Sequence, residues 1–353
     1  MPQWRRLRQR PPVTRLRAVA SRAKIGQKAP CRVGLVAIGK FGDQRLFSYV
    51  VSGLVVASEL ALPGLIPISL KRPTHDVTIR TGPVPATLEG ATATGPNWQL
   101  AGDRFLLAVP GVIRMLLTGG REMVFETDSG VSAEEAAIFL SSTGFGILLH
   151  QRGRIVLHAS AVRVGGSAVL FCGPSGAGKS TLAAALVDAG YDLVTDDFCG
   201  VSLHSDGSPW VEPDGRQLKL WQNSIDRLSL AARRAVPVRP QIEKYYVEPR
   251  AATAAPLPLA AMYVLREARP PHAPGIERPN IVDAGLMVRN NAYRPAIVRR
   301  MRQLDLYFQA AAAISQRAGV FTLTRTLDFK QFPTVIGWLE AQWRELGLLE
   351  RAA

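Results

Sequence analysis

The stretch Ala168-Val-Leu-Phe-Cys-Gly-Pro-Ser-Gly-Ala-Gly-Lys-Ser-Thr181 joins an apolar, strand-like run to a glycine-rich turn. Its second half fits the Walker A pattern, Gly-x-x-x-x-Gly-Lys-Ser, and a helix-like segment follows to about residue 189. In such a loop the glycines let backbone N–H groups turn inward around phosphate oxygens, and the helix N-terminus adds favourable partial charge. The sequence therefore predicts a nucleotide-binding strand–loop–helix unit. Its expected nucleotide-binding residues are Gly173, Pro174, Ser175, Gly176, Ala177, Gly178, Lys179, Ser180 and Thr181.

Two side chains of this loop have expected roles in phosphate chemistry. Lys179 would reach the β- and γ-phosphates of ATP, and the Ser180 hydroxyl would ligate Mg²⁺. The full pattern between a strand and a helix seldom arises by chance, and its alternative is a degenerate loop that binds nothing. We therefore expect ATP and Mg²⁺ as the cofactors.

An acidic pair, Asp196-Asp197, follows the strand expected over residues 191–195 and begins 17 residues beyond Lys179. In a parallel α/β unit the carboxyl end of that strand lies beside the loop, so both carboxylates are expected near the γ-phosphate. Consecutive residues at a strand end point to opposite sides and need not share a role. One acid can hold magnesium, and the other can take a proton from an attacking hydroxyl. The structural alternative is a turn or an N-cap.

A histidine is placed at the loop by hairpin register. Gly165-Gly166 separates two apolar runs, 154–164 and 167–172, and predicts a two-residue turn. Val164 then faces Ser167, and the same register sets His158 opposite Gly173. An imidazole there could contact the γ-phosphate or tune Asp196, whereas a lone strand histidine is otherwise structural. The remaining histidines, His75, His150, His204 and His272, have no comparable partner and are expected at the surface or at helix ends.

The positive charge is concentrated at the N-terminus. Residues 1–45 hold 12 Lys or Arg and one Asp, which accounts for most of the net charge of +15. This block is expected to be a disordered extension; contact with RNA, an acidic peptide or a membrane, and a mis-assigned start codon, are the alternatives. The rest of the chain is nearly balanced, so no DNA partner is expected.

The spacing of apolar runs and of Pro and Gly divides the remaining chain into two regions. Short apolar runs between Pro and Gly, the first of them 49–57, predict an antiparallel, strand-rich module over 46–130. A helix capped by Ser132 and running to about His150 opens a second domain over 131–353. Further strands are expected at 191–195, 198–203, 209–211, 217–220, 244–247, 260–265 and 320–324, with helices at 297–317 and 332–346. No apolar run reaches about 18 residues, so neither a transmembrane segment nor an export signal is expected and the chain is placed in the cytoplasm.

The three cysteines, Cys31, Cys172 and Cys199, are odd in number and lack metal-ligand spacing. They argue against a disulfide framework and against a zinc site. Cys172 ends an apolar run and is expected to be buried.

Leu157-His-Ala-Ser-Ala-Val162, the glycine-rich loop and Gly190-Tyr-Asp-Leu-Val-Thr-Asp-Asp197 together resemble the catalytic core of the HPr kinase/phosphorylase family. The resemblance is greatest to HPr-kinase-like proteins of peptide-modifying operons, including kinases of lasso-peptide precursors, and extends weakly to residues 47–63. It implies an α/β, P-loop HPr-kinase-like catalytic domain with the strand-rich module in front of it. The implied activity is transfer of the γ-phosphate of ATP to a serine hydroxyl of a peptide or protein.

Site roles follow from this resemblance. Asp196 is implied as the general base with His158 assisting, Lys179 as the catalytic phosphate ligand, and Ser180 and Asp197 as the magnesium ligands. Residues Glu212 and Arg216 form a possible counterpart of a later family loop, but their spacing differs, which argues against HPr as the acceptor and against phosphorylase activity. The family often forms oligomers, so a homo-oligomer is an expectation by analogy.

Three rival functions are left open. An ABC-type ATPase would share the loop, but neither its Leu-Ser-Gly-Gly-Gln signature nor a downstream strand ending in Asp-Glu is present. A regulatory or scaffold protein could bind ATP without transferring phosphate. A small-molecule kinase, acting for example on free serine, would use the same chemistry on another acceptor.

Overall fold

The computed structural model describes residues 40–41, 44–69, 74–239, 242–250, 252–253 and 255–350. The extension expected over 1–45 therefore lies outside the described residues except at its end. There, β1 (Lys40–Phe41) and β2 (Gln44–Arg45) pair antiparallel. Cys31 lies outside the described residues as well.

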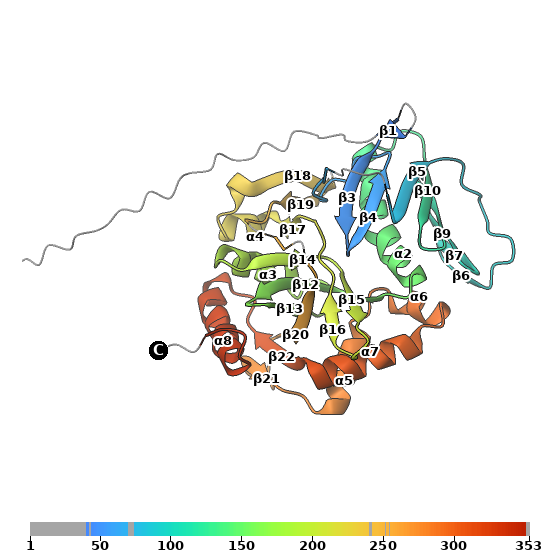
Figure 1. The fold of residues 1–353 in the computed structure, drawn as a ribbon. Helices are drawn as coiled ribbons and strands as arrows, with labels where there is room; N and C mark the ends of the chain where they lie inside the picture. The colour runs from blue at the N-terminus through green and yellow to red at the C-terminus, as the bar shows by residue number, and fades with distance from the viewer. Residues whose placement is uncertain are drawn as a thin grey trace, which may run out of the picture. The chain divides into compact units, whose positions relative to one another are not determined.

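Eight strands from residues 47–127 form the first sheet, in the order β3-β4-β5-β10-β9-β8-β7-β6 (Figure 1). Their bounds are β3 (Phe47–Val51), β4 (Leu54–Ser58), β5 (Val77–Thr81), β6 (Ala93–Gly95), β7 (Trp98–Ala101), β8 (Arg104–Val109), β9 (Ile113–Thr118) and β10 (Glu122–Thr127). In β9 every second residue is buried, as expected for a pleated strand with only one face against the core. The strand-rich character predicted for this region is confirmed.

Two details of this sheet differ from the predictions. It is mixed rather than antiparallel, because β5 runs parallel to both β4 and β10. The stretch 49–57, expected as one strand, is a hairpin of β3 and β4. Ser52 and Gly53 form its two-residue turn, with φ of 49° and 75°, the left-handed pair that matches the twist of a hairpin.

A helical segment packs on the first sheet. α1 (Ala133–Phe139) begins after Ser132, whose hydroxyl accepts the N–H of Glu135 at 3.2 Å, so the predicted N-cap is confirmed. The helix is not continuous to His150, because residues Leu140–Gly144 form a π-helical turn before α2 (Phe145–Gln151). Apolar residues of α1 and α2 share one core with those of the first sheet.

The second sheet has nine strands and contains the glycine-rich loop. Its order is β11-β15-β16-β20-β13-β12-β14, with β22 beside β20 and β21 beside β22. The bounds are β11 (Ile155–Leu157), β12 (Ala159–Val164), β13 (Ser167–Cys172), β14 (Asp192–Thr195), β15 (Cys199–Leu203), β16 (Pro209–Val211), β20 (Leu257–Glu267), β21 (Gly275–Glu277) and β22 (Gly319–Arg325). Strands β13, β20 and β22 are parallel and end at the same edge.

The predicted β12–β13 register is confirmed: Val164 faces Ser167 and Ala159 faces Cys172. β14 lies beside β12 and pairs antiparallel with it. Since β12 is antiparallel to both strands, β13 and β14 still point the same way. The acidic pair after β14 therefore reaches the edge that carries the loop.

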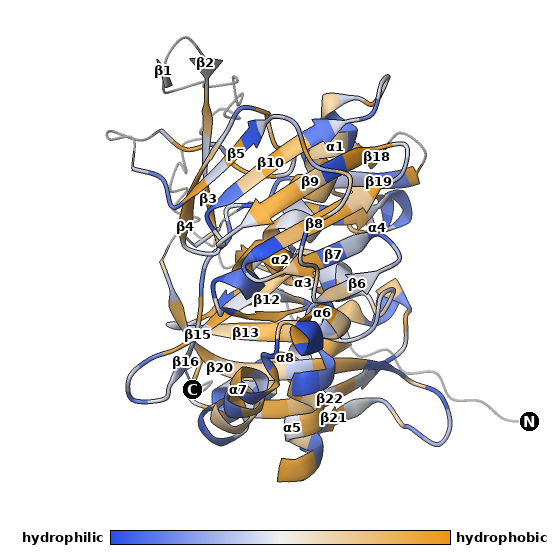
Figure 2. Cartoon of the chain, turned by 90° about the vertical axis from the view of Figure 1, so that its right-hand side faces the viewer, coloured by the Kyte–Doolittle hydropathy of each residue, from blue (hydrophilic) through white to orange (hydrophobic). Residues whose placement is uncertain are grey.

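Helices cover both faces of the second sheet (Figure 1), and its strands are largely apolar in Figure 2. One core contains α3 (Lys179–Asp188), α8 (Phe332–Glu345) and one set of alternating strand residues. The other contains α5 (Ile281–Asn290), α7 (Leu304–Arg317) and the opposite set. Because both faces are buried, these strands read as continuous apolar runs.

The helix expected over 297–317 is two helices, α6 (Pro295–Arg300) and α7, because Arg302 adopts a left-handed φ of 58° between them. α5 was not expected, although Asn280 caps it by accepting the N–H groups of Val282 and Asp283.

A third sheet, β17 (Leu218–Trp221), β19 (Ile242–Val247) and β18 (Arg234–Arg239), lies beside α3 together with α4 (Gln222–Arg227). Short 3-10 turns occupy Ala231–Arg233 and Phe329–Gln331. No helix in the described part of the chain combines the length and apolar character needed to cross a bilayer.

Candidate active site

The glycine-rich loop, residues 173–180, connects β13 to α3 in the predicted order. Gly178 is the N-cap of α3 and has a φ of 81°. This left-handed φ favours glycine, and a Cβ placed on Gly178 would lie 2.5 Å from Nη2 of Arg325, so a larger residue would have to displace that guanidinium. Pro174, Ser175 and Gly176 are exposed at the tip of the loop. The loop thus places backbone N–H groups at a helix N-terminus, where anions bind favourably.

Lys179 and Ser180 open α3 and contact different parts of the site. The Lys179 ammonium donates to the carbonyl oxygens of Gly173 at 2.8 Å and Pro174 at 3.0 Å, so it lies across its own loop. Burial lowers the pKa of Lys179 from its usual value. The Ser180 hydroxyl donates to Oδ1 of Asp196 at 2.8 Å. The loop and the acidic pair therefore belong to one hydrogen-bonded site.

Asp196 is buried and accepts three hydrogen bonds. Its Oδ1 accepts from the hydroxyls of Ser160 at 2.6 Å and Ser180, and its Oδ2 accepts the backbone N–H of Lys219 at 3.0 Å. Two of the three donors are hydroxyl groups. The carboxylate thus lies in surroundings that already direct O–H groups toward it.

Asp197 contacts different partners, as expected for adjacent residues at a strand end. Its Oδ2 forms an ion pair with Nζ of Lys219 at 2.7 Å, and its backbone has a φ of 78°. Burial alone would raise the pKa of Asp197, but the charge and hydrogen bond of Lys219, with Arg216 and His158, lower it well below its usual range. Asp197 is therefore ionised throughout the physiological range.

His158 lies between β11 and β12, one residue before the paired part of the hairpin. Its Nδ1 is 2.8 Å from the carbonyl oxygen of Asp197. Because a carbonyl only accepts, Nδ1 carries the proton and Nε2 of the neutral ring is an acceptor. Burial, followed by the charge of Lys179, lowers the pKa of His158, so the neutral form prevails at pH 7. Of the histidines expected at the surface or at helix ends, His150 lies in the last turn of α2 but is fully buried.

These side chains surround one pocket of about 780 Å³, a volume suited to a nucleotide-sized ligand. The predicted residues that line it are His158, Ser175, Gly176, Gly178, Lys179, Ser180, Thr181, Asp196 and Asp197. Gly173, Pro174 and Ala177 complete the loop backbone. The third sheet contributes Trp221 and Lys244 to the walls, and the segment after β22 contributes Phe329.

The donor set suits Mg²⁺ that is bound together with a nucleotide. Ser180 and the acidic pair supply hard oxygen donors, and Mg²⁺ in phosphate sites needs only one or two protein ligands beside phosphates and water. Within the described ranges, no three His, Cys, Asp or Glu side chains gather into a metal cage. A cation held mainly by the nucleotide phosphates is consistent with that composition.

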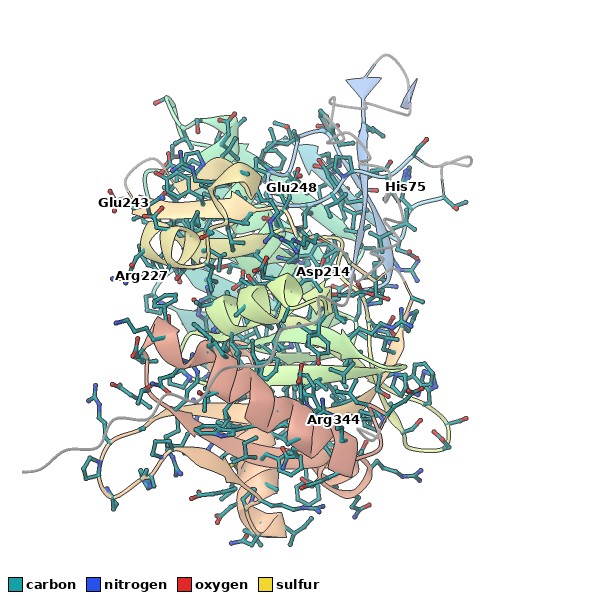
Figure 3. The ribbon with its side chains drawn as sticks, turned by 90° about the vertical axis from the view of Figure 1, so that its left-hand side faces the viewer. His75, Asp214, Arg227, Glu243, Glu248 and Arg344 are labelled. Carbon is teal, nitrogen blue, oxygen red and sulfur yellow. The ribbon has the colours of Figure 1, made fainter. Side chains whose placement is uncertain are left out.

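Glu212 and Arg216 do not line this pocket. Arg216 is buried and forms an ion pair with Asp214, and its guanidinium lies 4.3 Å from the centre of the Phe198 ring. Glu212 accepts a hydrogen bond from Ser202 at 3.0 Å. Figure 3 shows Asp214 in the interior, whereas Glu243 lies toward the outer side of the third sheet.

Sequence reasoning missed several residues of the site, among them Ser160, Lys219 and Arg325. Arg325 ends β22 at the edge that carries the loop. Residues at the carboxyl ends of parallel strands lie at one edge of a sheet, and the argument that located the acidic pair would therefore also have located Arg325. Lys219 had no comparable signal, because β17 belongs to a different sheet.

No known family model matches this chain, and no curated protein matches it. Among solved structures, it is similar to the Hpr(Ser) kinase/phosphatase from Coxiella burnetii, with a TM-score of 0.28 and 12% sequence identity. That match covers 54% of this chain and 94% of the other. At these values it does not establish a shared fold or family.

Proposed function

We propose that this chain is an ATP- and Mg²⁺-dependent kinase that transfers the γ-phosphate to a serine hydroxyl of a peptide or protein. The observation that carries the proposal is the direct hydrogen bond from Ser180 to Asp196. It joins a Walker A loop to a buried carboxylate in a pocket that also contains Asp197 and His158.

The phosphates would lie along the loop. The N–H groups at the start of α3 and the ammonium of Lys179, which donates to two loop carbonyls, would provide the positive potential that the β- and γ-phosphates require. When bound, Mg²⁺ would neutralise charge on these phosphates; Ser180 and Asp197 are the residues proposed to hold it.

The different surroundings of the two acids support different roles. Asp197, held ionised by Lys219, suits a cation ligand and is a poor proton acceptor. Asp196 already accepts hydroxyl protons in hydrogen bonds and is the proposed general base. In the reaction the acceptor oxygen bonds to the γ-phosphorus, the bond to the β–γ bridging oxygen breaks, and the hydroxyl proton passes to Asp196.

His158 would assist at the acceptor side. Its Nδ1–H is fixed by the carbonyl of Asp197, so its Nε2 can accept a hydrogen bond from the incoming hydroxyl or from a water. This role needs the neutral imidazole, which the lowered pKa provides.

The experiment compares Asp196→Asn with Asp197→Asn in phosphate transfer and in MgATP binding. Asp196→Asn is expected to lower transfer about 100-fold or more while MgATP affinity changes little. Asp197→Asn is expected to raise the Mg²⁺ concentration needed for half-maximal transfer. Asp192→Asn is the matched control, because Asp192 begins the strand that precedes the acidic pair and is paired with Arg163 outside the pocket.

Undiminished transfer in Asp196→Asn would contradict the base assignment. Binding of MgATP by the wild type without any transfer would favour the regulatory or scaffold function, and transfer to free serine alone would favour the small-molecule kinase.

A further inference from the structure

The described part of the chain contains two deeply buried arginines with opposite surroundings. Arg216, 2% exposed, has a carboxylate partner in Asp214. Arg325, 4% exposed, has no ion-pair partner among the described residues. Because an uncompensated charge is costly to bury, the second arrangement requires an explanation in function or in structure.

Arg325 binds the glycine-rich loop through carbonyl groups. Its Nη2 donates to the carbonyl oxygens of Ala177 at 3.0 Å and Gly178 at 3.4 Å, and its Nη1 donates to that of Thr326 at 3.1 Å. In a trans peptide the N–H points opposite to the C=O. Drawing these two loop carbonyls toward Arg325 therefore turns the N–H groups of Gly178 and Lys179 away from it. These are groups at the start of α3, where the phosphates are proposed to bind.

Arg325 itself lines the pocket. Among the described residues its buried Nε has no hydrogen-bond partner, and its guanidinium lies 5.4 Å from the centre of the Phe332 ring. Burial lowers the pKa of Arg325, and no neighbouring acid offsets the effect. A nucleotide polyphosphate in the adjacent loop would supply the negative charge that this arginine lacks.

We propose that Arg325 is a positioning residue of the nucleotide site: its guanidinium orients the N–H groups of Gly178 and Lys179, and bound phosphates compensate its charge. The proposal rests on the proposed function, because it requires that a nucleotide occupies the loop. It adds a basic residue from the end of β22 to the phosphate loop between β13 and α3.

The test is a calorimetric titration of the full chain with MgATP, with thermal unfolding of the unliganded proteins alongside. Arg325→Gln removes both the positive charge and the planar, forked set of guanidinium N–H donors, and it is expected to weaken MgATP binding about tenfold or more. Arg325→Lys keeps the charge without the planar fork and is expected to be intermediate. Arg266→Gln, which removes a neighbouring arginine paired with Glu277, is expected to bind within twofold of the wild type.

The unfolding data separate positioning from simple structural support. The proposal predicts that Arg325→Lys unfolds near the wild-type temperature yet binds MgATP more weakly; this variant decides the matter if Arg325→Gln does not fold. Wild-type affinity in both variants, or a loss no greater than in Arg266→Gln, would overturn it. Failure of the wild type itself to bind MgATP would instead refute the proposed function.

Discussion

At the residue scale, the protonation state of His158 is fixed by its surroundings. Burial and Lys179 lower its pKa below the usual 6.5, and the carbonyl of Asp197 selects the tautomer with the proton on Nδ1. A group whose pKa is lowered loses its proton as the pH rises through that lower value. The neutral ring is thus the form present at neutral pH.

The pH profile of transfer follows from this. If neutral His158 assists the acceptor, kcat/KM should fall as the pH decreases through a midpoint below 6.5, while Asp197 stays ionised across the same range. His158→Asn, measured on the same peptide, should lower the rate about tenfold or more and remove this acidic limb. An unchanged limb in the variant would assign the titration to another group.

At the element scale, the β12–β13 hairpin sets the register that brings His158 to the loop. Its turn depends on Gly165, which has a φ of 56° and whose Cβ would lie 2.5 Å from the carbonyl oxygen of Leu348. We expect Gly165→Ala to destabilise the protein by about 1–2 kcal/mol. Gly166→Ala is the matched control, because a Cβ there meets open space and its φ is not left-handed. Urea unfolding measures both, and equal effects would contradict the account.

Some of these elements could be predicted from the sequence and others could not. The hairpin register followed from the two-residue turn and the strand period, and the cap at Ser132 from a local side chain. The pairing of β14 with β12 did not follow from the sequence, because strand order depends on contacts between distant segments. Arg302 breaks a helix that its sequence would otherwise continue. The acidic pair was nevertheless located, since β13 and β14 end at one edge.

At the scale of the described chain, Arg216 links elements far apart in the sequence. It pairs with Asp214, contacts the carbonyl of Ser141 and covers the ring of Phe198. The position of Arg216 in the sequence suggested a counterpart of a loop in the HPr kinase/phosphorylase family. The spacing of residues along the chain does not predict whether such a side chain is buried. The pair does not line the pocket, although the charge of Arg216 helps to lower the pKa of Asp197 there.

Removing one partner of this buried pair should be costly. We expect Arg216→Ala to lower the free energy of unfolding by about 3–5 kcal/mol, because it leaves the Asp214 carboxylate buried and unpaired. Arg114→Ala, which removes a partly exposed pair with Glu126, should cost less than about 1 kcal/mol. Denaturant unfolding of both variants checks this, and equal losses would contradict a structural role for Arg216.

The central claim is that the loop, the acidic pair and His158 form one phosphoryl-transfer site. The most direct measurement incubates the full chain with γ-labelled ATP, Mg²⁺ and serine-containing acceptors, including any short peptide encoded beside its gene. We predict Mg²⁺-dependent labelled phosphoserine, and none with α-labelled ATP or with acceptors whose serine is replaced by alanine. Clear MgATP binding with no label on any serine-containing peptide or protein would contradict the claim.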